Sequence, residues 1–267
     1  MHNPNTSATD DALGDFSIVM VNYKTLELTR SALEFLRQVV DVTNVPVWVV
    51  DNYSDDESTE YLRSVDWIRL IERKIDRPET GALAHGRALD MVLERVDTPY
   101  LLLMHTDTFI YDATILRLML DAIRRDPTVF AVGCIDQIDR GLMRTAWRHV
   151  SRFMKHYSRK TMLALGLPSR QPKPYYEIYL KSFCALWNVS LIRDHAMHFS
   201  MADRTPGYEM QDRLTALGYR IVYITPRKMF RYLDHVQSGT VAAAGTYGKG
   251  HRRTRAYQAM LKKIGQR

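Results

Sequence analysis

Residues 16–56 read FSIVMVNYKTLELTRSALEFLRQVVDVTNVPVWVVDNYSDD. The runs Phe16–Asn22 and Val45–Val50 are almost entirely apolar, which is typical of strands that are buried on both faces. Between them, Leu26–Val40 has apolar residues at helical spacing. A strand, a helix and a second strand in this order predict a βαβ unit, in which both strands run in the same direction.

The same alternation continues as far as residue 134. The predicted helices are at 58–64, 83–96 and 113–125, and the predicted strands are at 67–71, 100–104 and 129–134. The sequence therefore predicts an α/β fold with a Rossmann-like central sheet, mostly parallel and covered by helices on both faces. Ligands of such sheets bind beyond the carboxyl ends of the strands, so we expect the chemistry just after residues 21, 50, 104 and 134.

The second half of the chain is less regular and predicts a smaller β/α region. The elements expected there are a basic amphipathic helix at 141–166, strands at 178–187 and 220–224, and helices at 189–195 and 207–217. We interpret residues 16–240 as a single domain with two halves, 16–135 and 136–240. A disordered lead-in at 1–15 and a basic tail at 241–267 are expected to flank it.

The composition is that of an ordinary globular protein, with 46% of the 267 residues hydrophobic and 25% charged. The net charge of +7 is unevenly spread, because Arg144–Lys173 holds eight Lys/Arg and no acid, and His251–Arg267 holds six and no acid. No apolar run is long enough to span a membrane, and the polar start lacks the apolar segment of a secretory signal. The two cysteines are expected to be buried free thiols, which favours a cytoplasmic protein.

Polar side chains follow three of the predicted strands. They are Asn22 and Tyr23, the run Asp51–Asp56, and the run His105–Thr108. Each group on its own also fits a turn or a helix cap. Their recurrence at three strand ends predicts a shared site at that edge of the sheet.

The motifs at these strand ends resemble those of family 2 glycosyltransferases, which have the GT-A fold. The first strand ends in Asn-Tyr within IVMVNYKT, and the second ends in VDNYSD at 50–55. The segment GALAHGRALD at 81–90 precedes an apolar strand that ends in a short acidic motif. The likeness covers residues 16–135 and returns more weakly over 179–240. It implies an inverting transfer of a sugar from a nucleotide-diphosphate donor to a hydroxyl acceptor. The half at 16–135 would then bind the nucleotide sugar, and the half at 136–240 the acceptor.

The resemblance implies a nucleotide-sugar site at the first two strand ends, for a UDP-, dTDP- or GDP-sugar. Asn22 and Tyr23 are expected at the donor, and Asp51 matches the acid that accepts a hydrogen bond from the nucleobase. His85 and Arg87 fall where a donor-binding residue is expected, and the arginine fork suits phosphate. Both also fit a helix face that is paired with nearby acids.

A divalent cation, Mn²⁺ or Mg²⁺, is the implied cofactor, because it neutralises the leaving diphosphate. Asp107 is the best candidate for its ligand. The first acid of the family's Asp-x-Asp motif is His105 here, which could bind the metal, contact the ribose or simply pack. His235 resembles a late histidine that some relatives supply as a further ligand, although a lone histidine is more often structural.

The implied catalytic base is a carboxylate near the start of a late helix. The usual Glu-Asp pair is missing from PGYEMQDRLTALGY at 206–219. Aligning the Arg and Gly-Tyr of this segment with the family pattern favours Glu209 as the base. Asp212 is the alternative, and Asp203 or no base at all are the remaining options. An acid in the first turn of a helix also stabilises the helix dipole.

The expected acceptor is a glycan or a polyprenyl-linked saccharide, as in polysaccharide biosynthesis. The basic helix at 141–166 and the tail suit the anionic inner face of a membrane, or the helix packs on the sheet. A nucleotidyltransferase is a second hypothesis, but the segment NYKTLELTR after Val21 lacks the glycines of its phosphate loop. A non-catalytic basic module or a degenerate family member is the third. Without a recognition motif, no nucleic-acid partner is expected.

Overall fold

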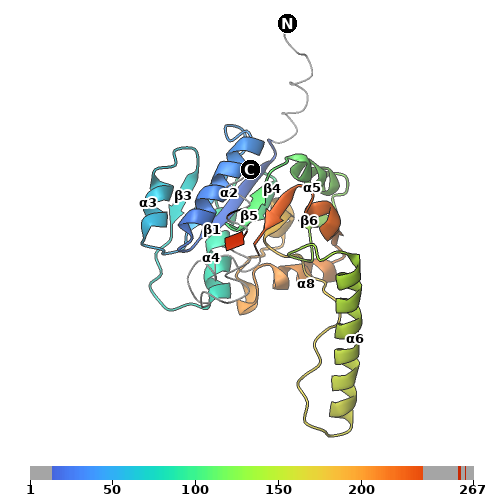
Figure 1. The fold of residues 1–267 in the computed structure, drawn as a ribbon. Helices are drawn as coiled ribbons and strands as arrows, with labels where there is room; N and C mark the ends of the chain where they lie inside the picture. The colour runs from blue at the N-terminus through green and yellow to red at the C-terminus, as the bar shows by residue number, and fades with distance from the viewer. Residues whose placement is uncertain (1–13, 237–257, 260–261, 263–267) are drawn as a thin grey trace.

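The computed structural model describes residues 14–236, 258, 259 and 262. A seven-stranded sheet forms its centre, with helices on both sides (Figure 1). Its strands are β1 (Phe16–Asn22), β2 (Val47–Asp51), β3 (Arg69–Glu72), β4 (Tyr100–Met104), β6 (Val129–Gly133), β7 (Cys184–Asn188) and β8 (Arg220–Tyr223). The predicted α/β fold class is confirmed. Most of the predicted lead-in and tail lies outside the described residues.

The strand order is β3-β2-β1-β4-β7-β6-β8. β1 runs parallel to β2 and β4, β2 runs parallel to β3, and β6 runs parallel to β8. Only β7 is reversed in this sheet, because it pairs antiparallel with both β4 and β6. Since β1, β2 and β4 are neighbours with the same direction, their carboxyl ends meet at one edge of the sheet.

Two hydrophobic clusters cover the two faces of the sheet. One receives α2 (Leu26–Val39), α3 (Glu57–Arg63) and α5 (Thr114–Arg124), and the other receives α4 (Gly81–Leu93), α7 (Val189–Asp194) and α8 (Tyr208–Ala216). Successive β1 side chains alternate between them, with Ile18 in the first cluster and Val19 in the second. Burial on both faces explains why β1 reads as one continuous apolar run.

A second sheet consists of two three-residue strands, β5 (Thr108–Ile110) and β9 (Leu233–His235), which follow β4 and α9 (Pro226–Met229) respectively. They pair antiparallel, with Thr108 opposite His235. Strands this short leave almost no periodicity to detect, and the sequence analysis did not predict them. Their pairing carries His235 to the carboxyl end of β4.

The strand predicted at 178–187 is wrong in its first half, because β7 begins only at Cys184. The backbone N–H of Leu180 donates to Oε1 of Gln211 at 2.8 Å, so a side chain satisfies a group that a strand would have used. The residues before β7 therefore form a loop, and this loop reaches the candidate site.

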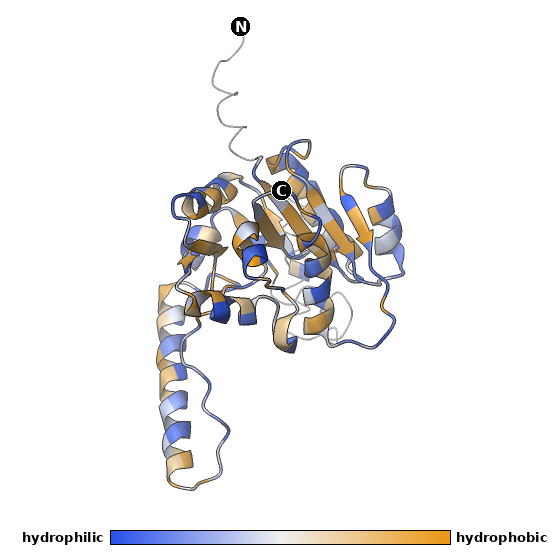
Figure 2. Ribbon diagram, turned by 180° about the vertical axis from the view of Figure 1, so that it is seen from behind, coloured by the Kyte–Doolittle hydropathy of each residue, from blue (hydrophilic) through white to orange (hydrophobic). Residues whose placement is uncertain are grey.

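The helix α6 (Leu142–Ala164) stands away from the rest of the structure (Figure 1). None of its residues is buried. Hydrophobic and hydrophilic residues are interleaved along its length, and the chain returns beside it (Figure 2). The helix therefore does not pack on the sheet, which was the purely structural alternative for this segment. No helix among the described residues is both long enough and apolar enough to cross a bilayer.

Candidate functional site

The carboxyl ends of β1 and β2 are joined by a buried hydrogen bond. Asn22 lies opposite Asp51 in the sheet register, and its Nδ2 donates to Oδ1 of Asp51 at 2.7 Å. Asp51 also accepts hydrogen bonds from the backbone N–H of Ser54 at 3.2 Å and the hydroxyl of Thr59 at 2.9 Å. A carboxylate offers about four acceptor positions, and these three hydrogen bonds hold the buried Asp51 carboxylate in place.

The same network reaches the end of β4. The hydroxyl of Thr25 donates to Oδ1 of Asn22 at 3.1 Å and lies 3.4 Å from the hydroxyl of Thr106. Thr106 directly precedes Asp107. The structure thus brings Asp51 and Asp107 to the same edge of the sheet, where the sequence predicted a shared site.

A cavity of about 500 Å³ lies beside this edge. Cavities of about 300–1,000 Å³ are typical of small-molecule sites. Of the predicted donor-site residues, Tyr23, His85 and His105 line it, whereas the buried Asn22 and Asp51 do not. The other residues of its wall are Val21, Asn52, Ile75, Glu79, Gly81, Ala84 and Thr106.

Two residues that the sequence analysis did not single out, Arg73 and Glu79, form a buried ion pair at this cavity. Nη2 of Arg73 lies 2.6 Å from Oε2 of Glu79, and Nη1 of Arg73 donates to Oδ1 of Asn52 at 2.8 Å. Arg87 donates to Glu79 as well. Burial raises the pKa of Glu79, but the hydrogen bonds from Arg73 and Arg87 outweigh it and the net shift is downward. The guanidinium of Arg87 is therefore engaged by Glu79.

His105, Asp107 and His235 form a cluster whose potential ligand atoms all lie within 4.8 Å of one another. Oδ1 of Asp107 lies 3.7 Å from Nδ1 of His105 and 3.2 Å from Nε2 of His235. Asp107 and His235 are buried, whereas His105 is half-buried in the cavity wall. The structure thus brings together the two predicted metal ligands and the histidine of the altered acidic motif.

The hydrogen bonds of His235 fix its tautomer. Its Nδ1 lies 3.0 Å from the carbonyl oxygen of Gln137, which can only accept, so Nδ1 carries the proton. In the neutral ring Nε2 then has a lone pair, and it forms no hydrogen bond with any described residue. Metal-binding histidines are commonly oriented by a carbonyl on their other nitrogen. The environment of His235 therefore fits a metal ligand.

Burial favours the neutral form of two histidines at the site, His105 and His85. Burial lowers the pKa of His105 to about 4, with Asp107 opposing the shift and His235 adding to it. Burial, followed by the effect of His105, lowers the pKa of His85 to about 3. A neutral imidazole offers a lone pair to a metal. One carboxylate with two imidazoles suits a transition metal such as Mn²⁺ better than Mg²⁺, which prefers oxygen ligands.

Two carboxylates of α8, the predicted base candidates, share one arginine. Nη1 of Arg204 lies 2.9 Å from Oε2 of Glu209 and 2.8 Å from Oδ2 of Asp212. Nε of Arg213 lies 2.9 Å from the other oxygen of Glu209. The hydrogen bonds from Arg213 and then Arg204 lower the pKa of Glu209. Asp212 instead accepts a hydrogen bond from the hydroxyl of Tyr179 at 3.0 Å.

The loop before β7 connects α8 with the histidine cluster. Oγ of Ser182 lies 2.9 Å from Nε2 of His105, and Tyr179, three residues earlier, binds the α8 carboxylate. One short loop therefore contacts both the α8 carboxylates and the histidine cluster. Asp203, the remaining base candidate, accepts a hydrogen bond from the hydroxyl of Thr80 at 2.6 Å, at the start of α4.

Residues 17–185, more than half of the chain, match glycosyl transferase family 2. The chain belongs to this family. The family 2 match includes β1 to β4 and the His105–Asp107 segment, but it ends before α8 and His235. The comparison with curated protein sequences gave no match.

Solved structures share the fold of this family 2 chain. The mannosyltransferase PcManGT from Pyrobaculum calidifontis, in complex with GDP-Man and Mn²⁺, has a TM-score of 0.56 and 15% identity, over 79% of this chain and 55% of that one. TarS 1-349 from S. aureus has a TM-score of 0.50 and 16% identity, over 85% of this chain and 62% of that one. A CMP:2-keto-3-deoxy-manno-octonic acid synthetase complexed with CTP has a TM-score of 0.48. The family 2 chain spans less than two thirds of the length of the first two structures.

Proposed function

We propose that this chain transfers a glycosyl group from a nucleotide-diphosphate sugar to a hydroxyl group of an acceptor. The observation that carries the proposal is the cluster of His105, Asp107 and His235 beside a cavity of nucleotide size. Both lie at the carboxyl ends of parallel strands, where α/β sheets bind ligands. The structure of PcManGT in complex with GDP-Man and Mn²⁺ supports the same combination here.

The donor, a UDP-, dTDP- or GDP-sugar, would occupy the cavity of about 500 Å³. Tyr23 is half-exposed in the cavity wall and its ring suits stacking on a nucleobase. Asp51 is the expected acceptor for a nucleobase N–H and Asn22 keeps its carboxylate in place, but Asp51 is buried behind the cavity wall, so the wall would have to open for this contact. His85 lies in the wall where it can contact the donor, and Arg87 would reach a phosphate only by leaving Glu79.

We assign the cation site to Asp107, His105 and His235, with Mn²⁺ preferred over Mg²⁺. When bound, the cation neutralises the charge of the diphosphate that leaves with the nucleotide. Hydrogen bonds within the protein orient two of these metal ligands, because the carbonyl of Gln137 contacts His235 and the hydroxyl of Ser182 contacts His105.

The base for the acceptor hydroxyl is assigned to α8, with Glu209 and Asp212 as the two candidates. A general base must come within about 3 Å of the proton that it removes. Glu209 has two arginine partners, which stabilise its ionised form and make it a weaker base. Asp212 shares one of these arginines and is more exposed, at 41% against 21%. A single displacement by the acceptor would invert the anomeric carbon.

The test is a thermal-shift panel of UDP, dTDP and GDP, each with and without Mn²⁺. The proposal expects one nucleotide to raise the melting temperature only when the metal is present, and expects Asp107→Asn to remove that dependence. A nucleotidyltransferase would instead release pyrophosphate from a nucleoside triphosphate and a sugar phosphate. A degenerate family member or a basic binding module would show no metal-dependent nucleotide binding.

A separate proposal concerns location at the anionic inner face of a membrane. Met143, Trp147, Val150 and Met154 recur at helical spacing on α6, and all four are exposed. α6 also carries basic residues and no acid. An amphipathic helix with Trp on one face and Lys/Arg on another suits the interface of an anionic membrane. Residues 252–255 and 263 of the basic tail lie outside the described residues.

A further inference from the structure

A second cleft, of about 580 Å³, lies where α6 meets the loop that leads back to β7. Its wall includes Arg152, Lys155 and Arg159 from α6, Lys173 from the returning chain, and Tyr179 and Tyr208 near the sheet. None of the described residues lines both this cleft and the cavity assigned to the nucleotide. The cleft is therefore a distinct place to bind a ligand.

The cleft concentrates positive charge that the protein itself does not balance. Arg152, Lys155, Arg159 and Lys173 form no ion pair with any residue in the described part of the chain. The acid in the wall, Glu177, lies 3.1 Å from Lys181 and is already paired. Four unbalanced cations around one cleft repel one another, and an anionic ligand would relieve that repulsion.

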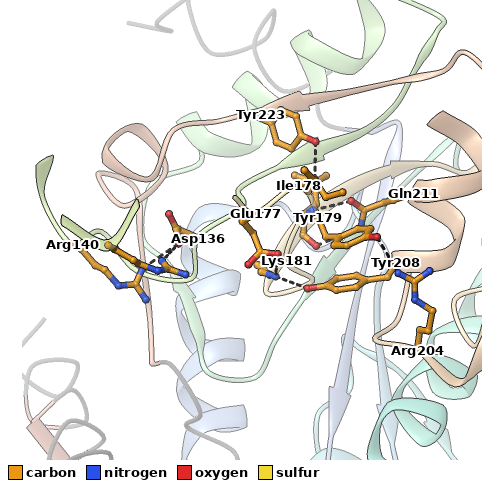
Figure 3. Close-up of polar contacts among 12 residues, drawn as sticks. Asp136, Arg140, Glu177, Ile178, Tyr179, Lys181, Arg204, Tyr208, Gln211 and Tyr223 are labelled. Atoms are coloured by element: carbon orange, nitrogen blue, oxygen red, sulfur yellow. Dashed lines mark hydrogen bonds and ion pairs between the residues drawn. The ribbon is translucent and has the colours of Figure 1, made fainter. Parts of the chain in front are cut away.

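An aromatic pair links these cations with the carboxylates of α8. Tyr179 stacks on Tyr208 with ring centroids 4.1 Å apart and planes 13° from parallel. Lys181 lies against Tyr208 on the cleft side, and Arg204 lies next to Tyr179 (Figure 3). Because Tyr179 donates to Asp212, a molecule lying along this wall would extend from the cations to a candidate base.

We infer that this cleft binds the phosphate or diphosphate group of an anionic acceptor. Arginine forks and lysine ammonium groups recognise phosphate oxygens through charge-assisted hydrogen bonds. With its phosphate between α6 and the returning chain, the acceptor would place its sugar hydroxyl beside Tyr179 and Asp212. The inference rests on the proposed glycosyl transfer and names its acceptor class. The phosphate belongs either to a soluble phosphorylated saccharide or to a lipid headgroup.

The test measures binding of inorganic pyrophosphate to the full chain by calorimetry in EDTA, so that no divalent cation is available at the histidine cluster. Arg152→Gln and Arg159→Gln remove cations from the cleft, and Lys160→Gln is the control, because Lys160 neighbours Arg159 on α6 but does not line the cleft. A lost charge-assisted bond should weaken binding about tenfold in each cleft variant. The control should change affinity less than about twofold.

Absence of pyrophosphate binding by the wild-type chain would overturn the inference, and so would equal weakening by Lys160→Gln. Circular dichroism and melting temperature of each variant show that the fold is intact, which is expected because no residue of α6 is buried. Vesicles of phosphatidylglycerol and phosphatidylcholine form a second arm. If the cleft variants lose vesicle binding and Lys160→Gln does not, the phosphate is a lipid headgroup. If vesicle binding is unchanged, or falls equally in Lys160→Gln, the phosphate belongs to a soluble acceptor.

The proposed function is tested separately on the same samples by nucleotide-dependent and Mn²⁺-dependent thermal shift. Variants that lose pyrophosphate binding but keep the nucleotide shift support the acceptor assignment. A wild-type chain that binds pyrophosphate in the cleft without any nucleotide shift overturns the acceptor role together with glycosyl transfer. In that case the cleft is an anion site of another kind.

Discussion

Nε2 of His235 lies 3.2 Å from Oδ1 of Asp107, although β9 and the end of β4 are far apart in the chain. Because Nδ1 of His235 donates to the carbonyl of Gln137, Nε2 is the ring nitrogen that faces the carboxylate. The pairing of two three-residue strands thus brings an imidazole nitrogen and a carboxylate oxygen within reach of one cation.

Mn²⁺ should stabilise the wild-type chain against heat more than Mg²⁺ does, because two of the three candidate ligands are imidazoles. With ligand at about a hundredfold excess over Kd, we expect the melting temperature to rise by roughly 5–10 °C. Asp107→Asn and His235→Gln should abolish the rise, whereas the exposed Asp121→Asn on α5 should keep it. Equal stabilisation of the Asp107 variant and the wild type would exclude this site.

Asn22→Ala should destabilise the fold, because Asn22 joins the ends of β1 and β2 and bridges to Thr25. Each buried polar group left without a partner costs about 1–3 kcal/mol, so the free energy of unfolding should fall by at least about 2 kcal/mol. Urea denaturation measures it. The matched control is Asn44→Ala, at an exposed site that contacts only an exposed aspartate, with an expected change within about 0.5 kcal/mol.

Glu209→Gln and Asp212→Asn each remove one candidate for the catalytic base. The variant that removes the true base should lower turnover by about 10²- to 10⁴-fold, while nucleotide affinity is unchanged. The measurement is acceptor-dependent release of the nucleotide. The pH profile gives an independent criterion. Since Arg213 and Arg204 lower the pKa of Glu209, Glu209 stays ionised at neutrality and into the acidic range.

If Glu209 is the base, the acidic limb of the turnover profile should therefore lie at lower pH than an ordinary glutamate would give. Arg213→Gln should raise the pKa of Glu209 and move this acidic limb to higher pH. Full turnover in both carboxylate variants would show that α8 does not supply the base.

Trp147→Ser should weaken binding of the chain to vesicles that contain phosphatidylglycerol. Trp147 is 72% exposed, and burying a side chain of this kind is worth about 1.5–3 kcal/mol, or at least about tenfold in affinity. Co-sedimentation measures the loss, and a blue shift of tryptophan fluorescence in the wild type reports insertion. Leu217→Ser, an exposed apolar site at the end of α8, is the control. Identical sedimentation of both variants would contradict membrane docking by α6.

Cys134 and Cys184 should not react with a thiol reagent at neutral pH while the chain is folded. Burial raises the pKa of Cys134 to about 11 and that of Cys184 to about 12, so neither forms appreciable thiolate. Both should react at once in denaturant, as a colorimetric thiol count would show. Rapid reaction of either thiol in the native chain would mean that the β6–β7 region opens readily.

The sequence by itself determined the central sheet. β1 and β4 were predicted correctly because strands covered on both faces must be apolar throughout, and this requirement is visible in the residues themselves. The polar residues at their ends were visible for the same reason, since they interrupt apolar runs. The polar run ERKIDRPET at 72–80, which contains Arg73 and Glu79, likewise interrupts the apolar pattern at the end of the third strand.

Only the tertiary structure decided which residues share a site. His235 was suggested by resemblance alone, and its position beside Asp107 depends on β9, which is too short to show a period. The cleft beside α6 is lined by residues from three separate segments of the chain, and the distances between those residues cannot be predicted from any local sequence pattern. The apolar and polar pattern of a strand or helix can be read from residues that are close in the chain. Ligand geometry instead arises from the long-range packing of strands and loops.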